Sequence, residues 1–210
     1  MRNLIKGLGL CLVMLSMAST AFAGTVKEYV ADLVDAKTGQ TMAKYYVTEN
    51  KIRVDMEGQN KGGKVATIIR MDQGKMYSLQ EDKTYIEFPF KDKISNLEDI
   101  GTKMMGGVAP KRTEEKLGSE TVNGYDTEKT RVTTNINMMG QKRTMVNTVW
   151  KAKEFDMPIR TQSDKGDITE MRNIKVGAPA DSVFEVPAGY TKNAELEEMM
   201  KRMQGLRGAK

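Results

Sequence analysis

Between residues 50 and 88, apolar and polar side chains alternate almost without interruption. In residues 50–57, the apolar set Ile52, Val54 and Met56 falls on one face of an extended chain, and charged residues fill the positions between them. A period of two is the pattern of a β-strand that covers a core on one side and meets water on the other. The segment therefore restricts the fold to one built on antiparallel sheet.

Segments with strand character, separated by turn formers, extend this pattern in both directions. We expect strands at 25–34, 40–49, 50–57, 65–71, 75–80 and 84–90 and, after an insertion, at 111–122, 125–139, 142–154, 157–164 and 167–176. The pair Asn123-Gly124 predicts a two-residue hairpin turn, since both positions must tolerate a positive φ. Residues 181–190 are expected to end the domain, because Pro187 and Gly189 interrupt further pairing.

Two stretches depart from strand periodicity. Residues 91–110 place apolar side chains at helical spacing up to Met104 and then reach a glycine pair, which predicts a short helix followed by a mobile loop. The tail 193–210 carries leucines and methionines on one helical stripe, with acids in its first turn and bases in its last. It predicts a short amphipathic helix.

These elements define a fold class. A sheet of about ten strands with one apolar face must roll up or pack against another layer, because that face cannot stay wet. Two short helices are too small to cover a flat sheet of that area. We therefore predict a mainly β (α+β) protein whose strongly curved antiparallel sheet forms an unclosed barrel, with a short helical insertion and a C-terminal helix.

The N-terminal residues predict export. Arg2 and Lys6 precede an apolar run of roughly 10 residues and a small-residue exit ending at Ala23, the pattern of a secretory signal peptide. The expected division is a signal peptide at 1–23, a β domain at 24–190 and a tail helix at 191–210. Cys11, the only cysteine, leaves with the signal peptide, so the mature chain has no disulfide and no stable membrane anchor. The expected localisation is periplasmic or secreted.

The residue types present exclude several chemistries. With no histidine and no mature cysteine, the chain lacks the Ser-His and Cys-His nucleophile pairs and the usual zinc, copper and haem ligands. We therefore expect no enzyme activity, no cofactor and no metal. The acids Asp164, Asp167 and Glu170 do not match a calcium loop and are interpreted as part of a polar hairpin.

The charge gives little support to a polyanionic partner. Removing Arg2 and Lys6 leaves 31 basic against 28 acidic residues, a net charge of +3 in the mature chain. The two signs are mixed along the sequence, and aromatic residues are not interleaved with basic clusters. Nucleic-acid binding is therefore not expected.

Methionine is unusually frequent. Of 17 methionines, 14 remain after signal cleavage, and the pairs Met104-Met105 and Met138-Met139 fall at predicted loop or turn edges. Neighbouring side chains in a strand cannot both face one core, and methionine adapts to variable apolar partners. Two roles are compatible with these pairs. They can be structural, or they can form an apolar edge that contacts a ligand. The candidate ligand-binding residues are Met104, Met105, Val108, Met138 and Met139.

Three segments carry a family resemblance. Residues 121–132, 149–160 and 173–190 resemble an uncharacterised family of exported bacterial proteins usually placed near the lipoprotein-localisation-factor fold of LolA and LolB. That resemblance implies a curved sheet forming an unclosed barrel whose apolar hollow is plugged by helices. Its motifs are turns and strand ends, and it implies no catalytic residues.

Two functions are compatible with these features. The first is binding of a lipid, an acyl chain or a lipidated polypeptide in an apolar hollow, with residues 91–110 as a lid and a lipid or lipoprotein as the partner. The alternative is a cell-envelope protein-interaction module whose sheet interior is filled by its own side chains. Its partner would be another envelope protein.

Overall fold

The computed structural model describes residues 25–57, 63–90, 110–138, 141–155, 157–195 and 198. Within them, twelve strands form one sheet and a single 3₁₀ turn, η1, precedes the last strand. The elements are β1 Tyr29–Asp35, β2 Thr41–Val47, β3 Lys51–Glu57, β4 Lys64–Arg70, β5 Lys75–Leu79, β6 Thr84–Pro89, β7 Lys111–Val122, β8 Tyr125–Met138, β9 Gln141–Ala152, β10 Arg160–Ser163, β11 Ile168–Val176, η1 Asp181–Phe184 and β12 Thr191–Lys192.

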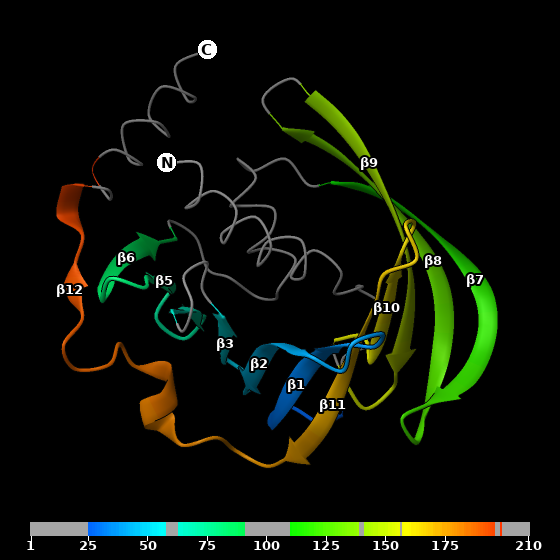
Figure 1. The fold of residues 1–210 in the computed structure, drawn as a ribbon, viewed down its shortest axis with the longest axis horizontal. Coiled ribbons are helices and arrows are strands. Elements are labelled where there is room, and N and C mark those ends of the chain that lie inside the picture. Colours follow the sequence, from blue (N-terminus) through cyan, green and yellow to red (C-terminus); the bar gives the residue numbers. More distant parts are fainter. Residues whose placement is uncertain are drawn as a thin grey trace.

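The sheet is built from two antiparallel meanders. Strands β1–β6 form the first meander and β7–β11 the second, and the strand order is β12-β6-β5-β4-β3-β2-β1-β11-β10-β9-β8-β7. The meanders join where β1 pairs with β11, with Leu33 opposite Met171. The sheet curves strongly and does not close, because β7 and β12 stand at its two edges (Figure 1).

The predicted fold class is confirmed in its sheet. The described residues give one curved, unclosed sheet with twelve strands rather than about ten, and all pairs are antiparallel except β12 with β6. The hairpin turn at Asn123 and Gly124 is present, with φ of 52° and 84°. The predicted helix at 91–110 lies outside the described residues apart from Pro110. The signal peptide at 1–23 lies outside the described residues and stays a prediction. Of the predicted tail at 191–210, residues 191–195 and 198 are described; Thr191 and Lys192 form β12, and the helix over the remaining residues stays a prediction.

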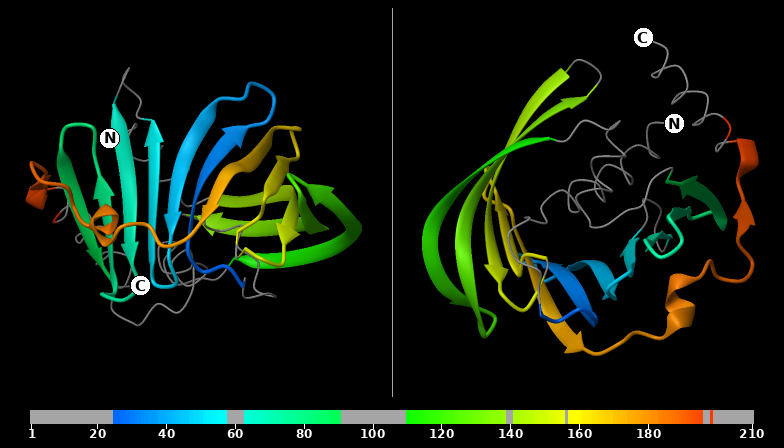
Figure 2. Two further views of the ribbon diagram at one scale, coloured as in Figure 1. Left: turned by 90° about the horizontal axis from the view of Figure 1, so that it is seen from below. Right: turned by 180° about the vertical axis from the view of Figure 1, so that it is seen from behind.

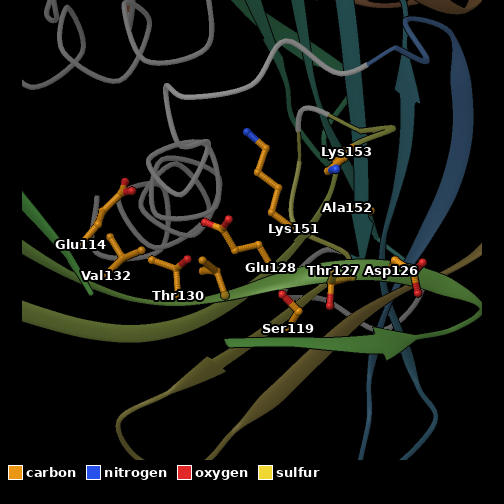
Figure 3. Close-up of a pocket in the computed structure, with 11 residues that line it drawn as sticks. Glu114, Ser119, Asp126, Thr127, Glu128, Thr130, Val132, Lys151, Ala152 and Lys153 are labelled. Carbon is orange, nitrogen blue, oxygen red and sulfur yellow. The ribbon is translucent and has the colours of Figure 1, made fainter. Parts of the chain in front are cut away.

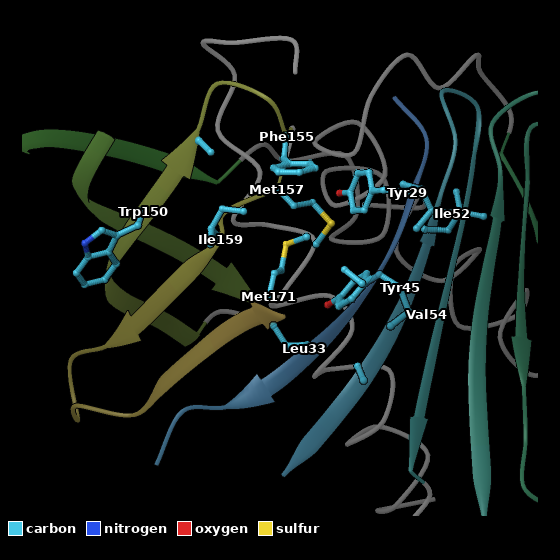
Figure 4. Close-up of a cluster of buried hydrophobic side chains, with 14 of the residues drawn as sticks. Tyr29, Leu33, Tyr45, Ile52, Val54, Trp150, Phe155, Met157, Ile159 and Met171 are labelled. Carbon is cyan, nitrogen blue, oxygen red and sulfur yellow. The ribbon is translucent and has the colours of Figure 1, made fainter. Parts of the chain in front are cut away.

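The concave, or inner, face of the first meander is apolar. Ile52 and Val54 of β3 are buried there as predicted, and Val54 lies opposite Tyr45 of β2. Figure 4 shows how side chains from β1, β2, β3 and β11 meet those of the β9–β10 connection. The buried residues packed together here, which we call the inner cluster, are Tyr29, Ala31, Leu33, Ala43, Tyr45, Ile52, Val54, Ile69, Met76, Val122, Trp150, Ala152, Phe155, Met157, Ile159 and Met171. Of these, Trp150 and Ala152 project from the opposite face of β9. Burial of these side chains holds the curved sheet together.

The outer face of the first meander is not simply solvated, contrary to the expectation from β3. Residues 181–192, which we call the C-terminal strap, run along that face past β3 and β4 and pair with β6 at β12 (Figure 2). Phe184 is fully buried in an outer cluster with Ala66, Ile68 and Leu79. Residues 181–190 therefore cover the domain rather than ending it.

Polar contacts fix the strap to the sheet. Arg53 Nη1 donates to the Val183 carbonyl oxygen over 2.8 Å, which ties a predicted solvent-facing residue to the strap. Arg70 is buried and contacts both Asp72 and Glu185. Its hydrogen bond holds the pKa of Asp72 below the ordinary value. Charged residues on the outer face are thus held by specific partners.

Candidate functional site

The second meander carries a pocket on its inner face. The pocket has a volume of about 330 Å³ and lies over β7, β8 and the end of β9 (Figure 3). Its lining residues are Glu114, Ser119, Asp126, Thr127, Glu128, Thr130, Val132, Val149, Lys151, Ala152 and Lys153. A volume of this size falls at the lower end of the range for small-molecule sites.

Strand register places most of the lining on one face. Glu128 of β8 lies opposite Ser119 of β7 and Lys151 of β9, and Thr130 lies opposite Val149. Paired residues in an antiparallel sheet project to the same side. The same face continues through β10 and β11 to Met171 in the inner cluster. The pocket and the apolar inner cluster therefore share the concave side of the sheet.

A β-bulge in β7 shapes the pocket. The register shifts between Lys116 and Gly118, so that Leu117 is an extra residue and Gly118 has a φ of 118°. Without the bulge, Gly118 would lie opposite Glu128. With it, Ser119 takes that position and brings a hydroxyl group to the lining.

The pocket has a charged rim and a partly apolar base. Glu114, Asp126 and Lys153 are exposed, whereas Val132, Val149 and Ala152 are buried. Glu128 forms an ion pair with Lys116, with 3.2 Å between Oε2 and Nζ. Asp126 Oδ1 accepts a hydrogen bond from Thr121 Oγ1 over 3.0 Å. Positively and negatively charged side chains therefore surround the opening of the pocket, and buried apolar side chains line its base.

The outer face behind this pocket is stiffened by an ionic network around Trp150 and Glu170. The Trp150 ring lies between Lys129 Nζ at 4.8 Å and Arg160 Cζ at 5.5 Å, and its Nε1 donates to Glu120. Cation–π contacts of this kind stabilise a buried indole ring. Trp150 thereby fixes the position of its neighbours Val149 and Lys151 in the lining.

Glu170 ties β11 to β10. It is buried and contacts Arg160 at 2.7 Å and Arg172 at 3.0 Å. Burial raises the pKa of Glu170, but hydrogen bonds from Arg172 and Arg160 outweigh that effect, so the pKa lies below its ordinary value. The predicted polar hairpin thus contributes a buried anion to the sheet.

The structure does not describe most of the predicted ligand-binding residues. Met104, Met105, Val108 and Met139 lie outside the described residues, and Met138 ends β8 with a side chain that is not described. The sequence did not single out the residues of the pocket. The available signal was the first half of β8, where both faces are polar, whereas β3 is polar on one face only.

The described residues contain neither a cluster of metal ligands nor a membrane-spanning helix. No group of three or more histidine, cysteine, aspartate or glutamate side chains within these ranges is placed to hold a metal ion. Asp167 instead contacts Lys37 at 3.7 Å. In the same part of the chain, no helix is long and apolar enough to cross a membrane.

A single curved sheet with two free edges and a site on its concave side defines an open-barrel β protein. The chain belongs to the family described as domain of unknown function DUF4412, whose model matches residues 30–157. The match begins in β1 and ends in the β9–β10 connection, so it includes the whole pocket. No curated protein matches the chain.

Several solved structures are similar to this chain at low sequence identity. PNGF-II has a TM-score of 0.52 and 10% identity over 85% of this chain, which spans only 34% of the PNGF-II chain. An uncharacterized conserved protein from Thermus thermophilus has a TM-score of 0.48 and 11% identity, over 88% of this chain and 98% of that one. Mycobacterium tuberculosis lipoprotein LppX has a TM-score of 0.38 and 17% identity, over 83% and 99%.

Proposed function

We propose that this chain is a non-enzymatic, exported envelope protein that binds a lipid, an acyl chain or a lipidated polypeptide on the concave side of its sheet. The observation that carries the proposal is the pocket of about 330 Å³ on the concave face, which continues across β10 and β11 to the inner cluster at Met171. Such a surface suits a ligand that is apolar at one end. Residues 121–132, 149–160 and 173–190 resemble an exported family usually placed near the LolA and LolB fold, and this resemblance supports the same function.

The chemistry of the pocket supports binding rather than catalysis. Its carboxylates Glu114 and Asp126 are exposed, and Glu128 is paired with Lys116. The chain contains no histidine, and its single cysteine is Cys11. The lining therefore offers ionic and apolar contacts, without a nucleophile held by an adjacent base.

Recovery of bound ligand tests this function. The protein, produced with its N-terminal residues and purified from the periplasm, is expected to show an added lipid mass in native mass spectrometry. It is also expected to take up a fluorescent fatty acid. Preparations that carry no lipid and take up no fatty acid would contradict the proposal.

A pocket-filling variant sharpens the test. Val132→Trp places an indole ring in the base of the pocket, and we expect it to reduce fatty-acid uptake at least tenfold. Val176→Trp is the matched control, because Val176 is 66% exposed on β11 and lies outside the lining. Equal uptake by both variants, with both folded by circular dichroism, argues against this pocket as the ligand site.

The second candidate function is a cell-envelope interaction module. It is favoured by the packing of the first meander, where Tyr45 and Ile69 are at most 1% exposed, so that the inner face is filled there. Deletion of residues 193–210 separates the two functions. Loss of a co-purified envelope protein with unchanged fatty-acid uptake favours the interaction module, and loss of uptake alone favours ligand binding.

A further inference from the structure

We propose that the pocket between β7 and β9 is the headgroup site for a phospholipid that carries both a phosphate and a primary ammonium, as phosphatidylethanolamine does. This inference rests on the proposed lipid-binding function and adds the class of lipid and its direction of binding. It starts from the distribution of charge and apolar surface in the pocket.

The pocket lining carries charged side chains of both signs. The lining holds Lys151 and Lys153 beside Glu114 and Asp126, and the third acid, Glu128, is paired with Lys116. Lysine ammonium groups bind phosphate as point charges, and carboxylates accept the three hydrogen bonds of a primary ammonium. A headgroup with both groups can contact side chains of both signs, whereas an anionic headgroup forms ion pairs only with the lysines and a neutral headgroup forms none.

Strand pairing places charged side chains of opposite sign next to each other. Strand register puts Lys151 directly opposite Glu128, and Asp126 lies two residues from Glu128 on the same face of β8. Glu114 and Lys151 rise from the same side of the ribbon in Figure 3. Groups of opposite sign therefore stand on neighbouring strands around one opening, where a single zwitterionic headgroup can contact both.

The pocket is charged at its rim and apolar at its base. Glu114, Asp126 and Lys153 are exposed at the rim, and Val132, Val149 and Ala152 are buried beneath them. The face that carries Val149 continues across β10 and β11 to Met171 in the inner cluster, and Met171 lies opposite Leu33 of β1. A volume of about 330 Å³ suits a headgroup and the start of its chains better than a whole two-chain lipid. The acyl chains therefore leave the pocket toward β1.

A panel of lipids with identical chains and a fluorophore on one acyl tail tests the assignment. We expect the wild-type protein to bind phosphatidylethanolamine at least tenfold more tightly than phosphatidylglycerol or diacylglycerol. The variant Lys151→Gln/Lys153→Gln is expected to weaken phosphatidylethanolamine binding at least tenfold and to leave diacylglycerol binding unchanged. Lys175→Gln is the matched control, since Lys175 is exposed on β11 and outside the pocket, and it should change neither affinity.

The acidic half of the site has its own variant. Glu114→Gln/Asp126→Asn removes two negative charges with nearly unchanged shape, and we expect it to shift the preference from phosphatidylethanolamine to phosphatidylglycerol. Thermal unfolding of each variant identifies a loss of folding. Where either double variant unfolds, the wild-type lipid preference and the single variants Lys153→Gln and Glu114→Gln decide the question.

Three outcomes overturn the inference, and they are distinguishable. Equal wild-type affinity for all three lipids removes the headgroup site but leaves lipid binding intact. Binding of none of the lipids and of no fatty acid removes the proposed function as well. If soluble glycerophosphoethanolamine competes as well as the intact lipid, the pocket binds a free headgroup and not a lipid.

Discussion

The two meanders use the same strand architecture for different purposes. In the first meander, β3 buries apolar side chains on its inner face, and β4 buries them on both faces, in the inner cluster and beneath the strap. In the second meander, β8 and β9 present an open, charged pocket on the inner face and an ionic network on the outer face. Stability is thus concentrated in one half of the sheet, which leaves the other half free to carry polar side chains at a site.

The largest predicted effect comes from removing the anchor of the strap. Phe184→Ala empties a fully buried position between the strap and β4, and we expect the free energy of unfolding to fall by about 3–5 kcal/mol. Chemical denaturation followed by circular dichroism measures this change. Val176→Ala is the control, since that side chain is largely exposed and should change stability by less than about 0.5 kcal/mol. A loss below about 1 kcal/mol in Phe184→Ala would show that the strap does not stabilise the first meander.

The same substitution in each meander compares the two halves directly. Val54 is buried in the inner cluster of the first meander, and Val132 is buried at the base of the pocket. We expect Val54→Ala to cost about 2–3 kcal/mol, from lost transfer energy and a new cavity, and Val132→Ala to cost about 1 kcal/mol because its methyl groups already border open space. Denaturant midpoints at equal m-values measure both. Equal losses would show that the two halves are packed equally well.

This contrast explains how much of the fold could be predicted from the sequence. The alternation of apolar and polar residues predicted strand β3 and its buried face, because a period of two is a local property of the sequence. Meander pairing also followed, since neighbouring strands in sequence pair through short turns. The junction of β1 with β11 was not predicted, because no local pattern encodes a pairing between residues so far apart.

The strap and the pocket were missed for different physical reasons. In β4, Ile68 and Ile69 point to opposite faces and are both buried, so consecutive apolar residues were the available sign that the outer face is also covered. In β8, charged residues such as Glu128 follow the pattern of an ordinary solvated strand face and do not indicate a site. Only the curvature of the sheet turns that surface into a pocket lining, and curvature is a property of the assembled sheet.

The buried anion at Glu170 gives a prediction about pH. Its pKa is lowered in the folded protein, so it stabilises the fold above the unfolded-state pKa of about 4 and that contribution is lost as pH falls through the folded-state value. Glu170→Gln is expected to cost about 2 kcal/mol at pH 7, because Arg160 and Arg172 lose a charged partner. Denaturation curves of both proteins from pH 7 to pH 3 should converge at the acid end. A constant difference across this range would mean that Glu170 acts through packing and not through its charge.

The smallest effect is expected where the strap ends. Glu87 of β6 contacts Lys75 at 3.0 Å and Lys192 of β12 at 3.3 Å, and the Lys75 hydrogen bond lowers the pKa of Glu87. Both lysines are about 40% exposed, so water screens these pairs, and Glu87→Gln should cost only about 0.5–1 kcal/mol, less at high salt. Because Phe184 anchors the same strap by burial, its variant should exceed this loss several-fold. If Glu87→Gln instead matches Phe184→Ala in denaturation, ionic contacts rather than apolar burial hold the strap, and the two meanders are stabilised in the same way.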